Sequence, residues 1–93
     1  MSETAVEVTD IDLGHWVQGT RFFKASDGKS FVIDSDLTEY PEGSTIFIRR
    51  PTGVLYCNAD ATVTDMVPDH VYPPGTTPEA AVAALGYTLE QGN

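Results

Sequence analysis

The side chains that could ligate a metal ion or attack a substrate are few and widely separated in the sequence. They are Cys57, His15, His70 and scattered carboxylates. Zinc sites usually contain close ligand pairs such as Cys-x-x-Cys or His-x-x-x-His, and neither pair occurs in this chain. We therefore expect no bound metal, a buried structural cysteine, and two histidines at the surface or in loops.

A nucleophile could be formed by Cys57 with His70 as its base. A reactive thiolate needs a cationic neighbour or a helix N-terminus. The nearest bases in sequence, Arg49 and Arg50, are expected across a hairpin, where strand alternation can point them away. The chain also lacks Gly-x-Ser-x-Gly, a glycine-rich phosphate loop and the acid spacing of a calcium loop. We expect no catalytic, cofactor-binding or metal-binding residues, and therefore a protein that is not an enzyme.

The most distinctive polar feature is the pair Arg49 and Arg50 before Pro51. Arginine is favoured at protein interfaces, so a hairpin tip that presents this pair could contact an acidic partner. The alternative is that both arginines neutralise nearby acids on the same surface. Tyr40 and Tyr72 lie in proline-flanked loops and are expected to be exposed. Tyr40, Arg49, Arg50 and Tyr72 are therefore the predicted protein-interaction residues.

Charge is distributed unevenly along the 93 residues, which carry a net charge of −9. All five basic residues lie between positions 21 and 50, whereas residues 1–20 and 51–93 contain acids and no Lys or Arg. This field repels phosphate backbones and anionic lipids, so we expect neither nucleic acid nor a membrane as partner. An acidic surface that imitates DNA and inhibits a DNA-binding protein is an alternative to a simple role in solubility.

The sequence favours a cytoplasmic location. A single cysteine allows no intrachain disulfide, and a small domain without disulfides suits a reducing cytosol. The N-terminus has no basic segment followed by an apolar one, so no signal peptide is predicted. No apolar run approaches the ~20 residues that a membrane span needs.

The elements that must position these side chains are organised around a hairpin over residues 21–34. Two runs rich in β-formers flank Asp27-Gly28, which favours a two-residue loop with positive φ at both positions. In that register Lys24 faces Phe31 and Phe22 faces Ile33. One face then carries Phe22, Phe31 and Ile33, and the other carries Phe23, Ala25 and Val32. Because both faces are apolar, we expect the hairpin to be covered on two sides or central in a sheet.

Further segments have strand character. Residues 5–9 alternate weakly in polarity. Residues 45–50 and 53–57 are predicted to form a hairpin whose three-residue loop, Pro51-Thr52-Gly53, ends in a glycine bulge at the start of the second strand. A further candidate strand, 61–67, ends at Pro68. Residues 69–75 are expected to be irregular because of Pro73-Pro74-Gly75. An edge strand formed by 45–50 or 61–67 could pair with a second copy to give a homodimer.

A single helix is predicted near the C-terminus. Thr77 can cap it, with Pro78 in the first turn and Gly86 just after the end. Thr76 with Glu79 would instead form a capping box one residue earlier. A helix of about eight residues is too short to be stable alone, so it must dock on the sheet.

These elements predict a mostly β fold of the α+β class. We expect a small antiparallel β-meander sheet or partial barrel of about four to six strands, with one short C-terminal helix. A single domain covers residues 1–93, because domains usually contain roughly 100–150 residues. Residues 1–4 and 89–93 are expected to be loose tails.

Several turn and cap signatures resemble those of one group of proteins. They are Arg21-Phe22-Phe23-Lys24-Ala25-Ser26-Asp27-Gly28, Glu39-Tyr40-Pro41-Glu42-Gly43-Ser44-Thr45, Arg49-Arg50-Pro51-Thr52, Pro74-Gly75-Thr76-Thr77-Pro78-Glu79 and Leu85-Gly86-Tyr87. Together they resemble small acidic proteins of unassigned activity from mycobacteriophages and related actinobacterial phages and prophages. The likeness covers roughly residues 20–87.

This resemblance implies a setting in the bacterial host cytoplasm. Small phage proteins of this kind often bind one host protein, such as a polar-growth or division scaffold, a replication factor or a transcription factor. The implied outcome is inhibition of host growth or exclusion of a superinfecting phage. A minor structural component of the virion is a further alternative. These expectations rest on analogy with the group and not on a site in the sequence.

Overall fold

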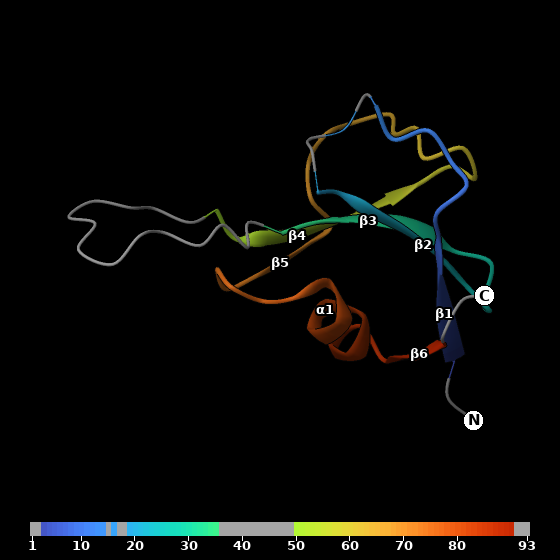
Figure 1. Ribbon diagram of the computed structural model, residues 1–93. Helices are drawn as coiled ribbons and strands as arrows, with labels where there is room; N and C mark the ends of the chain where they lie inside the picture. Colours follow the sequence, from blue (N-terminus) through green and yellow to red (C-terminus); the bar gives the residue numbers. More distant parts are fainter. Residues whose placement is uncertain (1–2, 15, 17–18, 36–49, 91–93) are drawn as a thin grey trace.

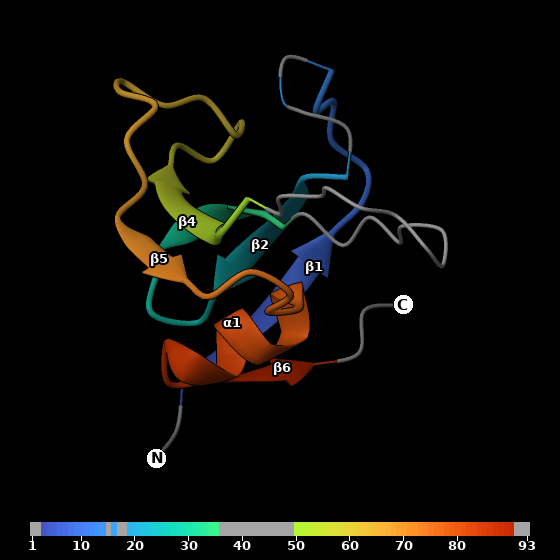
Figure 2. The ribbon, with the colours of Figure 1, turned by 90° about the vertical axis from the view of Figure 1, so that its left-hand side faces the viewer.

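The protein folds as a six-stranded sheet with one helix. The computed structural model describes residues 3–14, 16, 19–35 and 50–90. The elements are β1 (Glu3–Val8), β2 (Arg21–Ala25), β3 (Ser30–Asp34), β4 (Thr52–Cys57), β5 (His70–Tyr72), α1 (Pro78–Ala84) and β6 (Tyr87–Glu90). The strand order is β5-β4-β3-β2-β1-β6, and the mixed sheet curls into a half-barrel (Figures 1 and 2).

The first five strands form the predicted antiparallel meander. Each of β1 to β5 pairs with its sequence neighbour in antiparallel orientation. β6 then adds to the free edge of β1 as a parallel strand. Because β5 and β6 lie at opposite edges of the sheet, the connection between them crosses one face, and α1 lies in that crossing (Figure 2). The mostly β class and the short C-terminal helix are therefore confirmed.

The loop between β2 and β3 differs from the prediction. It contains three residues, Ser26 to Gly28, closed by a 2.9 Å bond from Ala25 N to Lys29 O. Gly28 has a φ of +91°, as the left-handed position of a glycine bulge requires. Asp27 Oδ1 accepts a 3.0 Å hydrogen bond from Lys29 N, which stabilises this wider turn. The predicted two-residue loop was wrong.

The extra loop residue shifts the hairpin register by one position. Phe23 is opposite Phe31, and Phe22 is opposite Val32. Phe23 therefore shares a face with Phe31 and Ile33, whereas Phe22 shares the other face with Val32. The sequence therefore predicted the wrong sheet face for both Phe22 and Phe23. A shift of the strand register by one residue moves each side chain to the opposite face of the sheet relative to its partner strand.

A core on the helix side of the sheet holds α1 in place. The buried residues of this helix-side core are Ala5, Phe23, Phe31, Ile33, Val54, Ala81, Val82 and Tyr87. The Phe31 ring is stacked against both Phe23 and Tyr87, with centroids 5.6 and 5.7 Å away. These offset aromatic contacts join β2, β3 and β6 across the sheet.

A smaller core lies on the other face, beneath the segments that connect β1 to β2 and β4 to β5 (Figure 1). Its buried residues are Trp16, Phe22, Val32, Leu55 and Ala61. Trp16 Nε1 donates a 2.8 Å hydrogen bond to Ala61 O, which ties the two covering segments together. The central hairpin is therefore covered on both faces and central in the sheet, as its two apolar surfaces predicted.

The helix begins where its capping signals indicate. Thr77 Oγ1 accepts a 3.1 Å hydrogen bond from Ala80 N, so Thr77 rather than Thr76 is the N-cap. Gly86 follows the helix with a φ of +94°. Arg21 on β2 bridges Glu7 on β1 and Glu79 on α1, at 2.7 and 3.0 Å. This partly exposed network fastens the helix to the sheet.

Several predicted elements are corrected by the structure. Residues 61–67 form no strand, and the short strand β5 occurs in the stretch expected to be irregular. Residues 3–4 belong to β1, and 89–90 to β6, so the tails are shorter than predicted. The predicted strand 45–50 lies outside the described residues except for Arg50, which is not in a strand. At Gly53 and Val54, β4 pairs with β3 on one side and β5 on the other.

Within the described ranges, no helix has the length and apolar character needed to cross a membrane.

Candidate functional site

The predicted interaction residues that the structure describes lie at the β4–β5 end of the sheet. Arg50 precedes β4, and its Nη1 donates a 2.8 Å hydrogen bond to Asp34 Oδ2 at the end of β3. This ion pair agrees with the alternative in which the arginine neutralises a nearby acid. Tyr72 lies in β5, not in a loop, and is half-buried against the helix-side core. Tyr40 and Arg49 lie outside the described residues.

β5 is an edge strand with one exposed apolar side chain. Its residues His70 to Tyr72 pair with β4, and no other described strand lies on the far side. Because side chains alternate along a strand, Tyr72 faces the helix-side core, whereas Val71 faces the opposite surface beside Leu55. Val71 is 59% exposed. The edge thus combines an exposed backbone with an exposed valine.

A groove runs beside Val71 on the face of the sheet away from α1. It has a volume of about 290 Å³ and is lined by Trp16, Asp34, Arg50, Pro51, Gly53, Leu55, Met66, Pro68 and Val71. Met66 on its wall is 62% exposed, and the adjacent Val67 is 64% exposed. Clustered exposed apolar side chains with a polar rim are typical of interaction sites. We refer to these nine lining residues as the β5 groove.

Gly53 of β4 and Pro68 lie against each other at the floor of the β5 groove. A Cβ atom at Gly53 would lie 3.4 Å from Pro68 Cγ. This separation is an ordinary van der Waals contact, and it shows that Pro68 lies directly over β4 at Gly53. Asp69 N also donates a 2.8 Å hydrogen bond to Val54 O, which holds the end of the Met66–Pro68 segment against the sheet.

The polar end of the β5 groove contains an incompletely satisfied carboxylate. Asp34 Oδ2 accepts from Arg50, whereas Asp34 Oδ1 is buried and has no hydrogen-bond partner among the described residues. The Thr20 hydroxyl is likewise buried and unpartnered. The β2–β3 register, continued by one residue, places Thr20 opposite Asp34. The two orphaned oxygens therefore belong to the same end of the sheet.

A row of aromatic rings occupies the other face of the same edge. His70 is stacked on Tyr72 with centroids 6.5 Å apart, and it makes an edge contact with Tyr56 at 5.8 Å. Lys29 Nζ lies 5.4 Å from the centroid of the Tyr56 ring. These contacts hold the short β5 strand against β4 from the helix side, so that Val71 is presented on a fixed edge.

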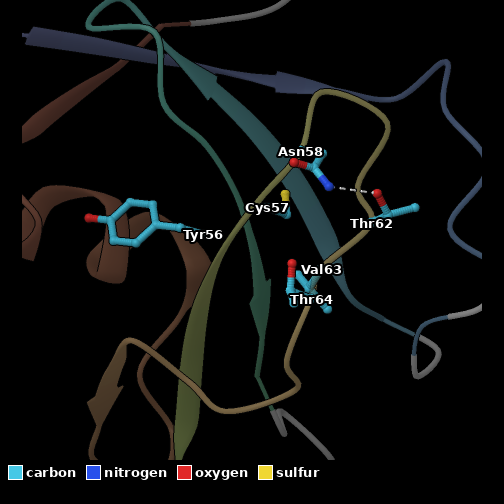
Figure 3. Close-up of a pocket in the computed structure, with 6 residues that line it drawn as sticks. All are labelled: Tyr56, Cys57, Asn58, Thr62, Val63 and Thr64. Carbon is cyan, nitrogen blue, oxygen red and sulfur yellow. Dashed lines mark hydrogen bonds between the residues drawn. The ribbon is translucent and has the colours of Figure 1, made fainter.

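A second pocket surrounds the only cysteine (Figure 3). It has a volume of about 210 Å³ and is lined by Tyr56, Cys57, Asn58, Thr62, Val63 and Thr64. Figure 3 shows the Asn58 side chain donating to Thr62 Oγ1, a bond of 3.0 Å, while Tyr56 points away from these loop residues. Burial, reinforced by the charge of Asp60, raises the pKa of Cys57 to about 11. The thiol is therefore protonated near neutral pH and is a poor nucleophile there.

The candidate metal and catalytic residues do not converge. His70 contacts the Tyr56 hydroxyl, 3.4 Å from its Nε2, on the helix side of the sheet, whereas Cys57 packs against the core on the other face. His15 lies outside the described residues. Across the part of the chain that the structure describes, no group of three or more His, Cys, Asp or Glu side chains is placed to hold a metal ion.

Most residues of the β5 groove were missed by sequence reasoning. Trp16, Leu55 and Val71 come from three separate segments, and only the folded sheet brings them together. Met66 lies in the predicted strand 61–67, whereas the structure shows an irregular segment there with Met66 62% exposed. The available signal was the apolar pair Met66-Val67 followed by Pro68 in an acidic stretch, a pattern equally compatible with an exposed loop.

The comparisons with known proteins show the family to which the chain belongs. A family model described as a family of unknown function, DUF7572, matches residues 4–88. The chain belongs to this family. The match extends from β1 into β6, so every residue of the β5 groove lies within it. No curated protein and no solved structure matches the chain.

Proposed function

We propose that this protein is a non-enzymatic binding module that receives an extended segment of a partner protein along β5. The observation that carries the proposal is the position of Val71, which is 59% exposed on an edge strand and lines an apolar groove. An extended peptide can add a strand to such an edge, while a neighbouring pocket receives alternate side chains.

The physical basis is the unpaired side of β5. An edge strand presents backbone N–H and C=O groups that can pair with another chain. Met66, Val67 and Val71 would lose contact with water when a partner covers them, which favours association. Methionine is also well suited to such a surface, because its flexible side chain adapts to different partners.

The class of partner that we propose, a bacterial host protein, follows from the setting that the resemblance to phage proteins implies. The resemblance to small acidic phage proteins supports a role in the cytoplasm of an infected or lysogenic actinobacterium. The partner would be a host protein, such as a polar-growth or division scaffold, a replication factor or a transcription factor. Binding would then inhibit host growth or exclude a superinfecting phage.

Affinity capture from a mycobacterial lysate tests the proposal when a variant on the edge strand β5 is compared with a variant on the opposite edge strand, β6. The immobilised wild-type protein is compared with Val71→Asp on β5 and with Thr88→Asp on β6, an exposed position at the opposite edge. We expect wild type and Thr88→Asp to retain the same host protein, and Val71→Asp to lose it. Circular dichroism and thermal unfolding establish that both variants fold.

Two results would contradict the proposal. One is capture that is equally strong with Val71→Asp and wild type. The other is the absence of any host protein retained specifically at physiological salt.

A further inference from the structure

The wall of the β5 groove carries an exposed methionine. The chain contains two methionines, Met1 and Met66, and Met1 lies outside the described residues. Met66 is 62% exposed, so reagents in solution have access to its side chain. Peroxides oxidise the methionine thioether to a polar sulfoxide, which methionine sulfoxide reductases convert back to the thioether. This residue therefore gives the groove a chemical reactivity that leucine or valine would not provide.

The other readily oxidised side chains in the described part of the chain are protected. Cys57 is half-buried, and burial together with the charge of Asp60 raises the pKa of its thiol to about 11. Because oxidation of cysteine follows its thiolate character and exposure, Cys57 reacts slowly near neutral pH. Trp16 is only 9% exposed. Among the described side chains, we therefore expect hydrogen peroxide to oxidise Met66 first.

Oxidation of Met66 changes the groove at a surface that a strand added to β5 would cover. Met66 lines the groove together with Leu55 and Val71. One oxygen atom is transferred from hydrogen peroxide to Met66 Sδ, and water is released. The sulfur is oxidised by two electrons, and the peroxide is reduced. The sulfoxide oxygen is a hydrogen-bond acceptor, so covering it with an apolar partner surface that offers no donor is unfavourable.

We propose that Met66 is a site of reversible oxidation, and that its sulfoxide weakens the binding of a partner segment along β5. This inference rests on the proposed function, because it describes the regulation of the surface that β5 presents. In the reduced protein, Met66 contributes apolar and adaptable surface to the groove. In the oxidised protein the same wall is polar, and binding remains weak until a methionine sulfoxide reductase restores the thioether.

The site of oxidation can be tested without a partner. The folded full chain is treated with hydrogen peroxide at neutral pH, and tandem mass spectrometry assigns each added oxygen atom to Met1, Trp16, Cys57 or Met66. We expect Met66 to gain one oxygen before Cys57 or Trp16 does, and the methionine sulfoxide reductases to remove it. In urea-unfolded protein, Cys57 should lose its protection and react faster. Oxidation of Cys57 or Trp16 ahead of Met66 in the folded protein would overturn the assignment.

The effect of oxidation on binding is measured with Met66→Leu as the matched control. Leucine retains an apolar side chain of similar size and has no thioether, while Met1 and Cys57 are unchanged in this variant. We expect peroxide to weaken the capture of the host protein from a mycobacterial lysate about tenfold for wild type, and the reductases to restore it. Capture by Met66→Leu should change by less than about twofold. Circular dichroism verifies that the treated proteins remain folded.

The outcomes separate this inference from the proposed function. Equal loss of capture by wild type and Met66→Leu after peroxide treatment would overturn the regulatory role, because another oxidised group would then be responsible. Unchanged capture by wild type that carries the Met66 sulfoxide would also overturn it. Either result is compatible with capture of a host protein through Val71. If Val71→Asp leaves host capture unchanged, the proposed function fails and the regulatory role fails with it, whereas mass spectrometry still decides the oxidation site.

Discussion

Tyr87 Oη donates a 2.8 Å hydrogen bond to Asp27 Oδ2, joining residues 60 positions apart. Tyr87 is the first residue of β6, and Asp27 lies at the tip of the β2–β3 hairpin. The same tyrosine ring stacks on Phe31 in the helix-side core. One side chain thus fixes the last strand both to the core and to the hairpin loop.

Removal of the Tyr87 hydroxyl should weaken the fold measurably. We expect Tyr87→Phe to lower the free energy of unfolding by about 1 kcal/mol, because it deletes one hydrogen bond and retains the stacked ring. Urea denaturation at neutral pH measures the change. Tyr72→Phe is the matched control, since the described part of the chain gives its hydroxyl no hydrogen bond. An equal loss in both variants would argue against a specific role for the Tyr87–Asp27 bond.

The same loop should make stability depend on acid pH. The backbone N–H of Lys29, and secondarily the Tyr87 hydroxyl, hold the pKa of Asp27 below its usual value. A lowered carboxylate pKa adds stability above the unfolded-state value of about 3.9, and this contribution is lost as the pH falls through the folded-state value. The stability curves of wild type and Asp27→Asn should therefore converge as the pH falls below about 4. Urea titrations at a series of pH values measure this.

Tyr87→Phe provides the comparison for the acid dependence. It removes the hydrogen bond from the Tyr87 hydroxyl, which lowers the pKa of Asp27 less than the bond from Lys29 N does, and it leaves the Lys29 bond in place. As the pH falls, the free energy of unfolding of Tyr87→Phe should approach that of wild type without reaching it. A constant difference between wild type and Asp27→Asn across the acid range would contradict the assignment.

The stacked aromatic core should be the most sensitive part of the molecule to truncation. Phe31 is fully buried and contacts the rings of Phe23, Tyr56 and Tyr87 on three other strands. We expect Phe31→Ala to cost about 3–5 kcal/mol, a large part of the stability of a small domain. Met66→Ala, at an exposed position, should change stability by about 0.5 kcal/mol or less. Comparable losses in the two variants would be inconsistent with this core.

The contribution of the N-cap of α1 to stability can be measured by removing the Thr77 hydroxyl and then restoring a hydroxyl with serine. Thr77→Ala should destabilise the protein by about 1 kcal/mol, because Ala80 N loses its hydrogen-bond acceptor. Thr77→Ser keeps an acceptor and should recover most of the loss. Thermal unfolding of the three proteins measures both effects. If Thr77→Ser is as unstable as Thr77→Ala, the cap is not the source of the loss.

The sequence was most informative where local chemistry determines structure. Thr77, Pro78 and Gly86 defined the helix ends correctly, because caps depend on a few adjacent residues. The hairpin was located correctly, but its register was not. Asp27-Gly28 suits both a two-residue loop and the last two positions of a three-residue loop. One additional turn residue was enough to exchange Phe22 and Phe23 between faces.

The missed features depend on contacts between distant segments. β6 is short, and it is a strand because it pairs in parallel with β1 at the other end of the chain. β5 contains three residues, and it forms a strand through its pairing with β4 although the neighbouring prolines disfavour regular structure. The β5 groove likewise combines residues from Trp16 to Val71. No local pattern in one sequence specifies such an arrangement.

Hydrogen–deuterium exchange of the protein, free and bound to the captured host protein, tests the β5 binding surface most directly. We expect binding to slow amide exchange in His70–Tyr72 and in the adjoining Met66–Pro68 segment, and to leave exchange in Tyr87–Glu90 at the opposite edge of the sheet unchanged. Slower exchange confined to β6 or α1, with β5 unchanged, would show that the partner does not bind along β5.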